Sequence, residues 1–252
     1  MKCTAASLLK KGGRPYQEDH LGHIIVESED ADLVHPMECW ALADGLGGHG
    51  GGHIASEIAV QHLLTSFEER PSMDESVIKQ YINQANQLII ERQHEAFELS
   101  NMRTTIVVLI TNGTEARWAH IGDSRLYHFL NGRLSTRTRD HSVPEAMARA
   151  GDIREHEIRF HEDRNRLLRT LGHAEDYRDP TLSPTPIAIS TDDAFLLCTD
   201  GFWEYVTETE MEVDFAKAQS PEHWLELMEL RLFHRVEPKN DNYSATAIFI
   251  EP

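Results

Sequence analysis

The chain has 252 residues, of which 40% are hydrophobic, which is enough for one large packed domain and too many for a disordered chain. Its 42 acidic and 24 basic side chains give a formal net charge of −18, which repels nucleic acid and anionic membranes and excludes both as partners. No apolar run reaches the roughly 20 residues of a membrane helix, and the first residues lack the long apolar segment of a signal peptide. The three cysteines lie far apart, so we expect buried free thiols in a cytoplasmic protein.

Short apolar runs bounded by turn residues predict strands along the chain. These runs are Thr4–Leu9, Leu21–Val26, Cys39–Ala43, Thr104–Thr111, Ala116–Ile121, Leu126–Leu130, Arg133–Thr136, Ala194–Thr199 and Ala245–Ile250. Asn131-Gly132, between two of them, is typical of a two-residue hairpin turn.

Helical periodicity predicts four helices, two of them long and adjacent. They are Ile54–Glu68, Asp74–Ser100, Val143–Ala150 and Pro221–His234. Because strands precede and follow the helical pair without regular βαβ alternation, we expect an α+β layered domain rather than a doubly wound sheet. The chain has no linker or repeat, so residues 1–252 are predicted to form a single domain, and without an obvious exposed apolar stripe we expect a monomer.

The loop Asp44–Gly52 places a carboxylate and then six glycines in eight residues directly after the apolar run Cys39–Ala43. Glycine leaves no Cβ in the way of a ligand, so this loop can bring backbone close to a bound group, although a flexible turn is the alternative. His49 and His53 have the spacing of a helical metal pair, but Gly50–Gly52 lie between them and argue against a helix. We therefore expect both histidines in a surface loop and no zinc site.

Further acidic residues flank other apolar runs. Glu18 and Asp19 precede the run that begins at Leu21, Asp123 and Asp200 each follow a run, and Asp241 precedes Ala245–Ile250. Strand ends from distant parts of a sheet meet at one edge, and carboxylates brought together there repel unless cations neutralise them. Oxygen ligands of this kind suit Mg²⁺ or Mn²⁺. Any one of these sites alone is also typical of a turn, so their repetition carries the prediction.

Arg14 lies four residues before Glu18, after Gly12-Gly13. A guanidinium beside a cluster of metal-binding acids makes sense if an anionic ligand lies between the cations and the arginine, because guanidinium binds phosphate through two parallel hydrogen bonds. The alternative is a surface arginine in a local ion pair.

Five motifs in order resemble those of the metal-dependent protein phosphatases (PPM), the type 2C serine/threonine phosphatases. They are Arg14–Asp19, Asp44–His49, Gly122–Arg125, Thr199–Gly201 and Asp241-Asn242. The resemblance spans nearly the whole chain and is closer to the compact bacterial members. Each motif is weak alone, but five in the family's order and approximate spacing are highly specific.

The resemblance implies a four-layer αββα sandwich, with two central antiparallel β-sheets flanked by helices, and two Mn²⁺ or Mg²⁺ ions at the sheet ends. The implied protein ligands are Asp19, Asp44, the Gly45 backbone carbonyl, Asp200 and Asp241. Glu18 would act through a bound water, Asp123 matches a third, weaker metal site, and Arg14 matches the phosphate-binding arginine.

The implied activity is hydrolysis of phosphoserine and phosphothreonine in a protein substrate by direct attack of a metal-bridging water. No covalent phosphoenzyme is needed, and Ser124 and Cys198 have no evident base partner. The partner would be a bacterial Ser/Thr kinase or its targets. One alternative is a catalytically silent phosphatase-like binding domain, which tends to lose ligands, and another is a structural cation-binding protein, in which Arg14 has no role.

Four residues depart from the family's pattern: Gln17 stands where Asn is usual, Leu46 where animal members carry a His proposed as general acid, Arg103 where Gly is common, and Ser244 where Thr is usual. None removes an implied ligand, so we expect an active enzyme. The charged segment 154–166 is typical of solvated surface, with recruitment of phosphopeptide by one of its arginines (Arg154, Arg159 or Arg164) as the alternative.

Overall fold

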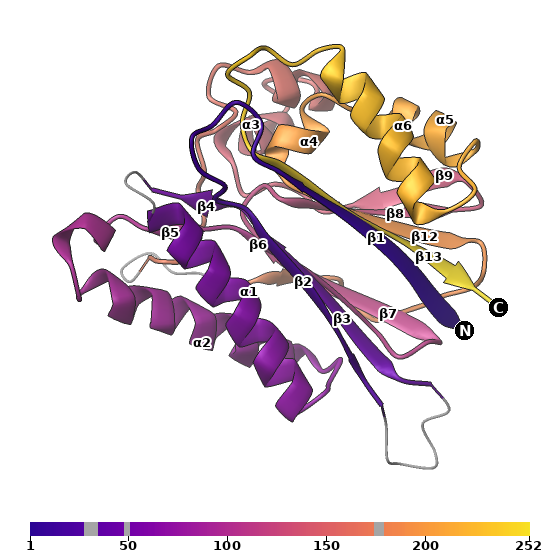
Figure 1. Cartoon of the computed structure of the whole chain (residues 1–252), viewed down its shortest axis with the longest axis horizontal. Helices are drawn as coiled ribbons and strands as arrows, with labels where there is room; N and C mark the ends of the chain where they lie inside the picture. The colour runs from indigo at the N-terminus through magenta and orange to yellow at the C-terminus, as the bar shows by residue number, and fades with distance from the viewer. Residues whose placement is uncertain (28–34, 48–50, 174–178) are drawn as a thin grey trace.

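The structure, a computed structural model, describes residues 1–27, 35–47, 51–173 and 179–252. Two antiparallel sheets pack face to face, and helices cover both outer faces (Figure 1), so the predicted αββα sandwich is confirmed. The first sheet runs in the order β1 (Lys2–Lys10), β13 (Tyr243–Glu251), β12 (Asp193–Cys198), β8 (Arg125–Leu130) and β9 (Arg133–Arg137). Its strands β1 and β13 bring the two ends of the described chain together, with Lys2 opposite Glu251.

The second sheet runs in the order β10 (Thr181–Leu182), β7 (Glu115–Ile121), β6 (Ile106–Thr111), β3 (Met37–Ala43) and β2 (His20–Val26), and β11 (Ile187–Ala188) also pairs with β7. A separate two-stranded ladder joins β4 (Gly45–Leu46) to β5 (Arg103–Thr104). The predicted single strand Thr104–Thr111 is therefore divided, because the Thr105 backbone N–H donates to the Asp44 carbonyl at 2.9 Å instead of continuing a ladder.

Two helices, α1 (Gly51–Glu69) and α2 (Glu75–Gln93), cover the second sheet, and α5 (Glu208–Phe215) and α6 (Pro221–Phe233) cover the first (Figure 1). Two short helices, α3 (Val143–Ala150) and α4 (Asp200–Trp203), and two 3₁₀ turns, η1 (Phe97–Leu99) and η2 (Glu155–Phe160), complete the fold. Ser142 caps α3 through the backbone N–H of Glu145.

Apolar residues fill all three interfaces between the layers. Along β3, Cys39, Ala41 and Ala43 face the helices, whereas Trp40 and Leu42 face the other sheet. This alternation follows from the two-residue period of a strand, and both faces are buried. Strands of this kind therefore read as continuous apolar runs in the sequence.

The structure corrects three predictions about helices. The helix predicted over Asp74–Ser100 ends at Gln93, because its apolar face ends at Ile89 and Ala96 is extended. Helix α5 was missed because its residues have no apolar period. A capping box between Thr207 and Glu210 begins this helix.

The third correction concerns the glycine loop, since α1 begins at Gly51 despite its glycines. A Cβ on Gly52 would lie 2.7 Å from the Gly45 backbone, so glycine is needed there for close packing rather than for a loop. His53 is exposed in the first turn of α1, and His49 lies outside the described residues.

Cys3, Cys39 and Cys198 are all free, as predicted, and Cys3 is only partly buried. Among the described residues, no helix combines the length and the apolar character needed to cross a membrane. The hairpin at Asn131-Gly132 is also confirmed, with φ of +52° and +75°, as a two-residue turn of that type requires.

Candidate metal centre and active site

A cavity of 270 Å³ at one end of the sandwich collects most of the sequence-predicted acids. It is lined by Arg14, Glu18, Asp44, Gly45, Leu46, Gly47, Asp123, Asn165, Leu167, Asp200, Asp241 and Asn242. The acids among them follow β3, β7 and β12 or precede β2 and β13, so the strands of both sheets position them. Of the eight predicted site residues, only Asp19 does not line the cavity.

Asp19 is 2% exposed and lies among hydroxyl donors. Its Oδ2 accepts hydrogen bonds from Ser244 Oγ at 2.6 Å and from Thr199 Oγ1 at 3.2 Å, whereas its Oδ1 is buried without a partner. Burial raises the pKa of Asp19 to about 8, and repulsion from Asp200 and Asp241 adds to the shift. Ser244 therefore keeps the hydroxyl that the usual Thr would supply, and one oxygen remains available for a cation.

The other acids influence one another in the same way. Burial raises the pKa of Asp44 well above its usual range, and the charges of Asp19, Asp200, Asp123 and Asp241 raise it further. The pKa values of Asp123 and Asp200 are raised as well, first by burial and then by neighbouring carboxylates. These groups therefore lie close enough to disfavour full ionisation unless a positive charge compensates them.

Two threonines hold the backbone of Asp44 in place. The Asp44 backbone N–H donates to Thr105 Oγ1 at 2.9 Å, and Thr104 Oγ1 donates to the Asp44 carbonyl at 2.8 Å. Thr105 Oγ1 also contacts Ser124 Oγ at 2.7 Å, beside Asp123. The Ser124 hydroxyl therefore supports Thr105, in agreement with the expectation that Ser124 is not a nucleophile.

Arg14 reaches Asp241 directly, because its Nη2 donates to Asp241 Oδ2 at 2.6 Å. The two side chains are 51% and 40% exposed, so solvent screens this ion pair. The expected gap of phosphate size between the guanidinium and the acids is therefore closed in this structure.

A second amide network fixes the segment that carries Glu18 and Asp19. Asn242 Oδ1 accepts from the Glu18 backbone N–H at 2.8 Å, and its Nδ2 donates to the carbonyls of Lys11 and Tyr16. Gln17 Oε1 accepts from the Asp19 backbone N–H at 3.0 Å, while its Nε2 is buried without a partner. The longer amide at Gln17 thus supports the loop but leaves one donor unused.

Glycines permit the close backbone approach that the cavity needs. A Cβ on Gly45 would lie 2.2 Å from the Gly52 carbonyl oxygen and 2.5 Å from that of Glu18. A Cβ on Gly201 would lie 2.0 Å from the Asn242 carbonyl oxygen. Both contacts are shorter than any real Cβ contact, so only glycine fits at these two positions.

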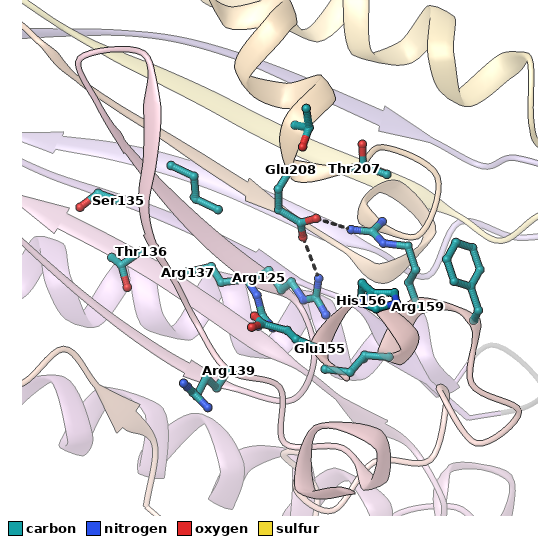
Figure 2. A pocket seen from close by; sticks show the side chains of 14 residues that line it. Arg125, Ser135, Thr136, Arg137, Arg139, Glu155, His156, Arg159, Thr207 and Glu208 are labelled. Carbon is teal, nitrogen blue, oxygen red and sulfur yellow. Dashed lines mark hydrogen bonds and ion pairs between the residues drawn. The ribbon is translucent and has the colours of Figure 1, made fainter. Parts of the chain in front are cut away.

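A second cavity, of 770 Å³, is lined by arginines and contains none of the predicted acids (Figure 2). Arg125 and Arg159 both contact Glu208 in its wall, the second at 2.7 Å. Arg159 was a candidate for an exposed recruiting residue, but its side chain is 7% exposed and it also donates to the Trp203 carbonyl. Arg164 is 38% exposed and donates to Glu204 at 2.6 Å.

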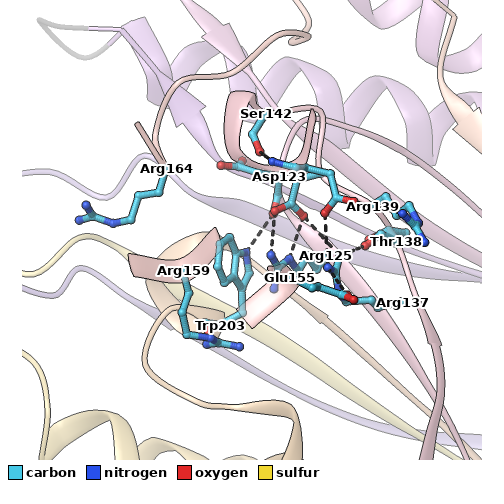
Figure 3. Close-up of polar contacts among 12 residues, drawn as sticks. Asp123, Arg125, Arg137, Thr138, Arg139, Ser142, Glu155, Arg159, Arg164 and Trp203 are labelled. Carbon is cyan, nitrogen blue, oxygen red and sulfur yellow. Dashed lines mark hydrogen bonds and ion pairs between the residues drawn. The ribbon is translucent and has the colours of Figure 1, made fainter. Parts of the chain in front are cut away.

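Asp123 is held from the side of that second cavity (Figure 3). Trp203 Nε1 donates to the Asp123 backbone carbonyl at 2.9 Å. The guanidinium of Arg125 lies 3.4 Å from the centre of the Trp203 ring and makes two hydrogen bonds, of 2.8 and 2.7 Å, to Asp140. A buried ion pair and an indole therefore position the loop that carries Asp123.

The donor set agrees in chemistry with a hard divalent cation. The acids offer carboxylate oxygens, one of them buried and unpartnered on Asp19, and no histidine or cysteine lines the cavity along the described residues. Within the described ranges, however, no three or more His, Cys, Asp or Glu side chains are grouped so that they could hold an ion as they stand. The structure therefore brings the ligand types together around one cavity without a closed coordination site.

Sequence reasoning did not predict that hydroxyl side chains support the acids. Thr104, Thr199 and Ser244 lie in or beside strands, where hydroxyl side chains are common and give no functional signal. Asn165 and Leu167 also line the cavity, at the end of the charged segment 154–166 and directly after it, and neither was a candidate site residue.

The chain is similar to known bacterial phosphatases. It is 34% identical over 204 residues to the serine/threonine phosphatase stp of Listeria welshimeri, across 79% of this chain and 77% of that protein. It is 29% identical over 187 residues to the serine/threonine protein phosphatase PstP of Mycobacterium tuberculosis, across 73% of this chain and 35% of that protein.

Solved structures agree with the sequence comparison. Stp1 from Staphylococcus aureus has a TM-score of 0.84 and 26% identity, covering 100% of this chain and 96% of that one. The Mycobacterium tuberculosis phosphatase PstP/Ppp has a TM-score of 0.82 and 26% identity, covering 99% of both chains. The family profile for protein phosphatase 2C matches residues 13–232, which include four of the five motifs, and Asp241-Asn242 follows the matched region. The chain therefore belongs to the protein phosphatase 2C family, and it is a protein phosphatase.

Proposed function

We propose that this enzyme hydrolyses phosphoserine and phosphothreonine in proteins, using water activated by two divalent cations, Mn²⁺ or Mg²⁺. One observation carries the proposal: five acidic side chains and Arg14 line a single 270 Å³ cavity at the ends of two sheets. The named serine/threonine phosphatases among its relatives support the same substrate class. The catalytic domain of a serine threonine protein phosphatase PstP was solved in complex with 2 manganese ions, which supports the choice of metal.

The proposed ligands have three roles. Asp19, Asp44, Asp200, Asp241 and the Gly45 carbonyl would hold the two cations. Glu18 would act through a water, and Asp123 with Asp200 would form a third, weaker site. When bound, the cations supply a water of lowered pKa and compensate the charge of the phosphate oxygens.

Arg14 has a proposed role that starts from its contact with Asp241. Arg14 now pairs with the Asp241 carboxylate at 2.6 Å, and it would be released from this pair if Asp241 held a cation. The freed guanidinium would then bind the phosphate through two hydrogen bonds and orient it for in-line displacement. Leu46 provides an apolar wall beside this position and cannot donate a proton, so the leaving group would take its proton from solvent.

The proposed partner is a bacterial Ser/Thr kinase, or its targets, in the cytoplasm, with the phosphatase acting as a monomer. The three free cysteines support a reducing compartment. The catalytically silent alternative would bind a phosphoprotein without turning it over.

Metal removal tests the proposal. After treatment with a chelator, the enzyme is expected to lose hydrolysis of 4-nitrophenyl phosphate and of a phosphothreonine peptide, and added Mn²⁺ should restore both. A phosphotyrosine peptide of the same sequence serves as the control and should be turned over poorly. Full activity in the metal-stripped enzyme would contradict the metal mechanism, and no activity with any metal would favour the silent domain.

The pKa shifts predict how the metal-free protein responds to pH. The pKa of Asp19 is about 8 in the folded protein and 3.8 for an unperturbed aspartate. Between pH 3.8 and about pH 8, the folded state therefore holds a proton on Asp19 that the unfolded state does not. The resulting stability is complete below about pH 4 and is lost as pH rises through about 8. In thermal unfolding, the melting temperature of chelated protein should fall by about 5 °C or more from pH 5 to pH 8. Mn²⁺ favours the ionised acids, so the stabilisation that it gives should grow over the same range, and a constant shift would contradict the prediction.

A further inference from the structure

Three cavities follow one another along the segment 159–167. Asn165 and Leu167 line the carboxylate cavity, and the preceding Arg164 lines a neighbouring cavity of 610 Å³. Arg159 and Phe160 line both that cavity and the 770 Å³ cavity of Figure 2. The two outer cavities therefore adjoin at Arg159 and Phe160, and the neighbouring residues Arg164 and Asn165 link them to the proposed phosphate site.

The lining of the two outer cavities has a charge opposite to that of the whole chain. Six arginines and three glutamates line the two outer cavities, whereas the chain carries a net charge of −18. An acidic ligand is repelled by most of the surface and is attracted to a local positive region. Asp140, Glu145 and Glu210 pair with some of these arginines from behind the lining, so the excess of positive charge is confined to the lining itself. The lining therefore favours an acidic group at this face.

The buried arginines of the lining are already paired with acids. Arg125 is 3% exposed and paired with Asp140, and Arg159 is paired with Glu208. A ligand would compete poorly for these two guanidiniums, because their removal from an existing buried partner is costly.

Arg139 is different, because its side chain is 69% exposed and its nearest acid, Glu145, lies 3.6 Å away. Within the part of the chain that the structure describes, the side chains of Ser135, Thr136 and His156 make no hydrogen bond or ion pair, and all three line the same cavity as Arg139 (Figure 2). Carboxylates accept hydrogen bonds from hydroxyl, imidazole and guanidinium donors. The rim thus offers several free donors around an accessible cation.

Phe160 separates the two outer cavities and is 78% exposed. A single exposed aromatic side chain is unremarkable on its own, but this one lies between two cavities rich in arginine. Aromatic side chains and arginine are the residue types enriched where protein partners bind.

We propose that the two outer cavities dock the phosphoprotein substrate, and that they take an acidic stretch flanking the phosphorylated residue. This inference rests on the proposed function for the position of the phosphate. Arg139 and the hydroxyls of Ser135 and Thr136 would bind carboxylates of the stretch, while Phe160 packs against its backbone and apolar atoms.

Two phosphothreonine peptides test the docking proposal, one with a flanking run of Asp and Glu and one with the matching run of Asn and Gln. The wild-type enzyme should have a lower KM for the acidic peptide, and 0.5 M salt should reduce the difference. Arg139→Gln and Phe160→Ala should each raise the KM for the acidic peptide about three- to fivefold. Neither should change hydrolysis of 4-nitrophenyl phosphate, which is too small to reach the outer cavities.

Arg149→Gln is the matched control, because Arg149 is an exposed arginine on α3 outside both cavities. Equal KM values for the two peptides, or an equal effect of Arg149→Gln, would overturn the docking proposal while leaving the proposed function in place. If the enzyme hydrolyses no phosphate ester, the proposed function fails instead. Fluorescence anisotropy with the labelled acidic peptide then still decides docking, since Arg139→Gln must weaken binding and Arg149→Gln must not.

Discussion

Asp44→Asn is expected to reduce Mn²⁺-dependent hydrolysis of 4-nitrophenyl phosphate about a thousandfold. The charges of Asp19, Asp123, Asp200 and Asp241 all raise the pKa of Asp44, so Asp44 lies close to all four of these acids. An amide keeps the size of the side chain but removes a negative ligand, which weakens charge stabilisation by several kcal/mol. Initial rates at saturating Mn²⁺ measure the effect.

The same substitution should make the metal-free protein more stable, which separates a lost ligand from a lost fold. Burial raises the pKa of Asp44, so ionisation opposes folding at pH 8, and an uncharged amide removes that cost. The melting temperature of chelated Asp44→Asn should therefore lie above that of the wild type at pH 8. Asp192→Asn, in an exposed turn, should change neither activity nor melting temperature. A stable variant with activity within tenfold of the wild type would show that Asp44 binds no catalytic metal.

The acids of the cavity could be predicted from the sequence because each lies where a buried run ends or begins. Asp44 follows Cys39–Ala43 and Asp200 follows β12, and such edges of a sandwich are forced together by the packing of the sheets. The grouping of strands and helices predicted only a layered α+β domain, and the resemblance to the phosphatase family implied the sandwich. Strand β3 buries residues on both faces and therefore appears as an unbroken apolar run.

The contacts that hold the acids could not be predicted, because they join residues far apart in the chain. Ser244 and Asp19 are 225 residues apart, and nothing in the local sequence of either indicates their 2.6 Å hydrogen bond. Arg14 and Asp241 show the same limit, because an arginine near a carboxylate motif predicts a phosphate site as readily as an ion pair. Arg103 pairs with Leu46 in the small ladder, and nothing in the structure explains why it replaces the usual glycine.

The segment 154–166 shows how charge patterns mislead when tertiary contacts decide burial. Its arginines appeared equivalent in the sequence, yet Arg159 is buried against Glu208 and the carbonyl of Trp203, whereas Arg164 remains partly exposed. A segment of mixed charge is solvated only when no acid or carbonyl of the folded protein lies close enough to pair with its arginines. Arg139, which the sequence did not single out, is an exposed arginine in the lining of the second cavity.

Breaking the ion pair between Arg125 and Asp140 is expected to have the largest effect on stability. The two side chains are 3% and 1% exposed, and the guanidinium makes two hydrogen bonds to the carboxylate. Arg125→Met would leave Asp140 buried without its partner, which costs about 3–5 kcal/mol. Urea denaturation followed by tryptophan fluorescence measures the change, since Trp203 stacks on this arginine.

Two further variants distinguish a broken charge pair from a general loss of packing. Arg125→Met combined with Asp140→Leu removes both charges and should recover much of the lost stability, because no buried ion remains unpaired. Arg133→Met removes an arginine that is 81% exposed and paired with Glu212, and it should cost less than about 1 kcal/mol. If the double variant is as unstable as Arg125→Met, the arginine stabilises the fold through its stacking on Trp203 rather than through its charge, and the loop of Asp123 depends on that stack.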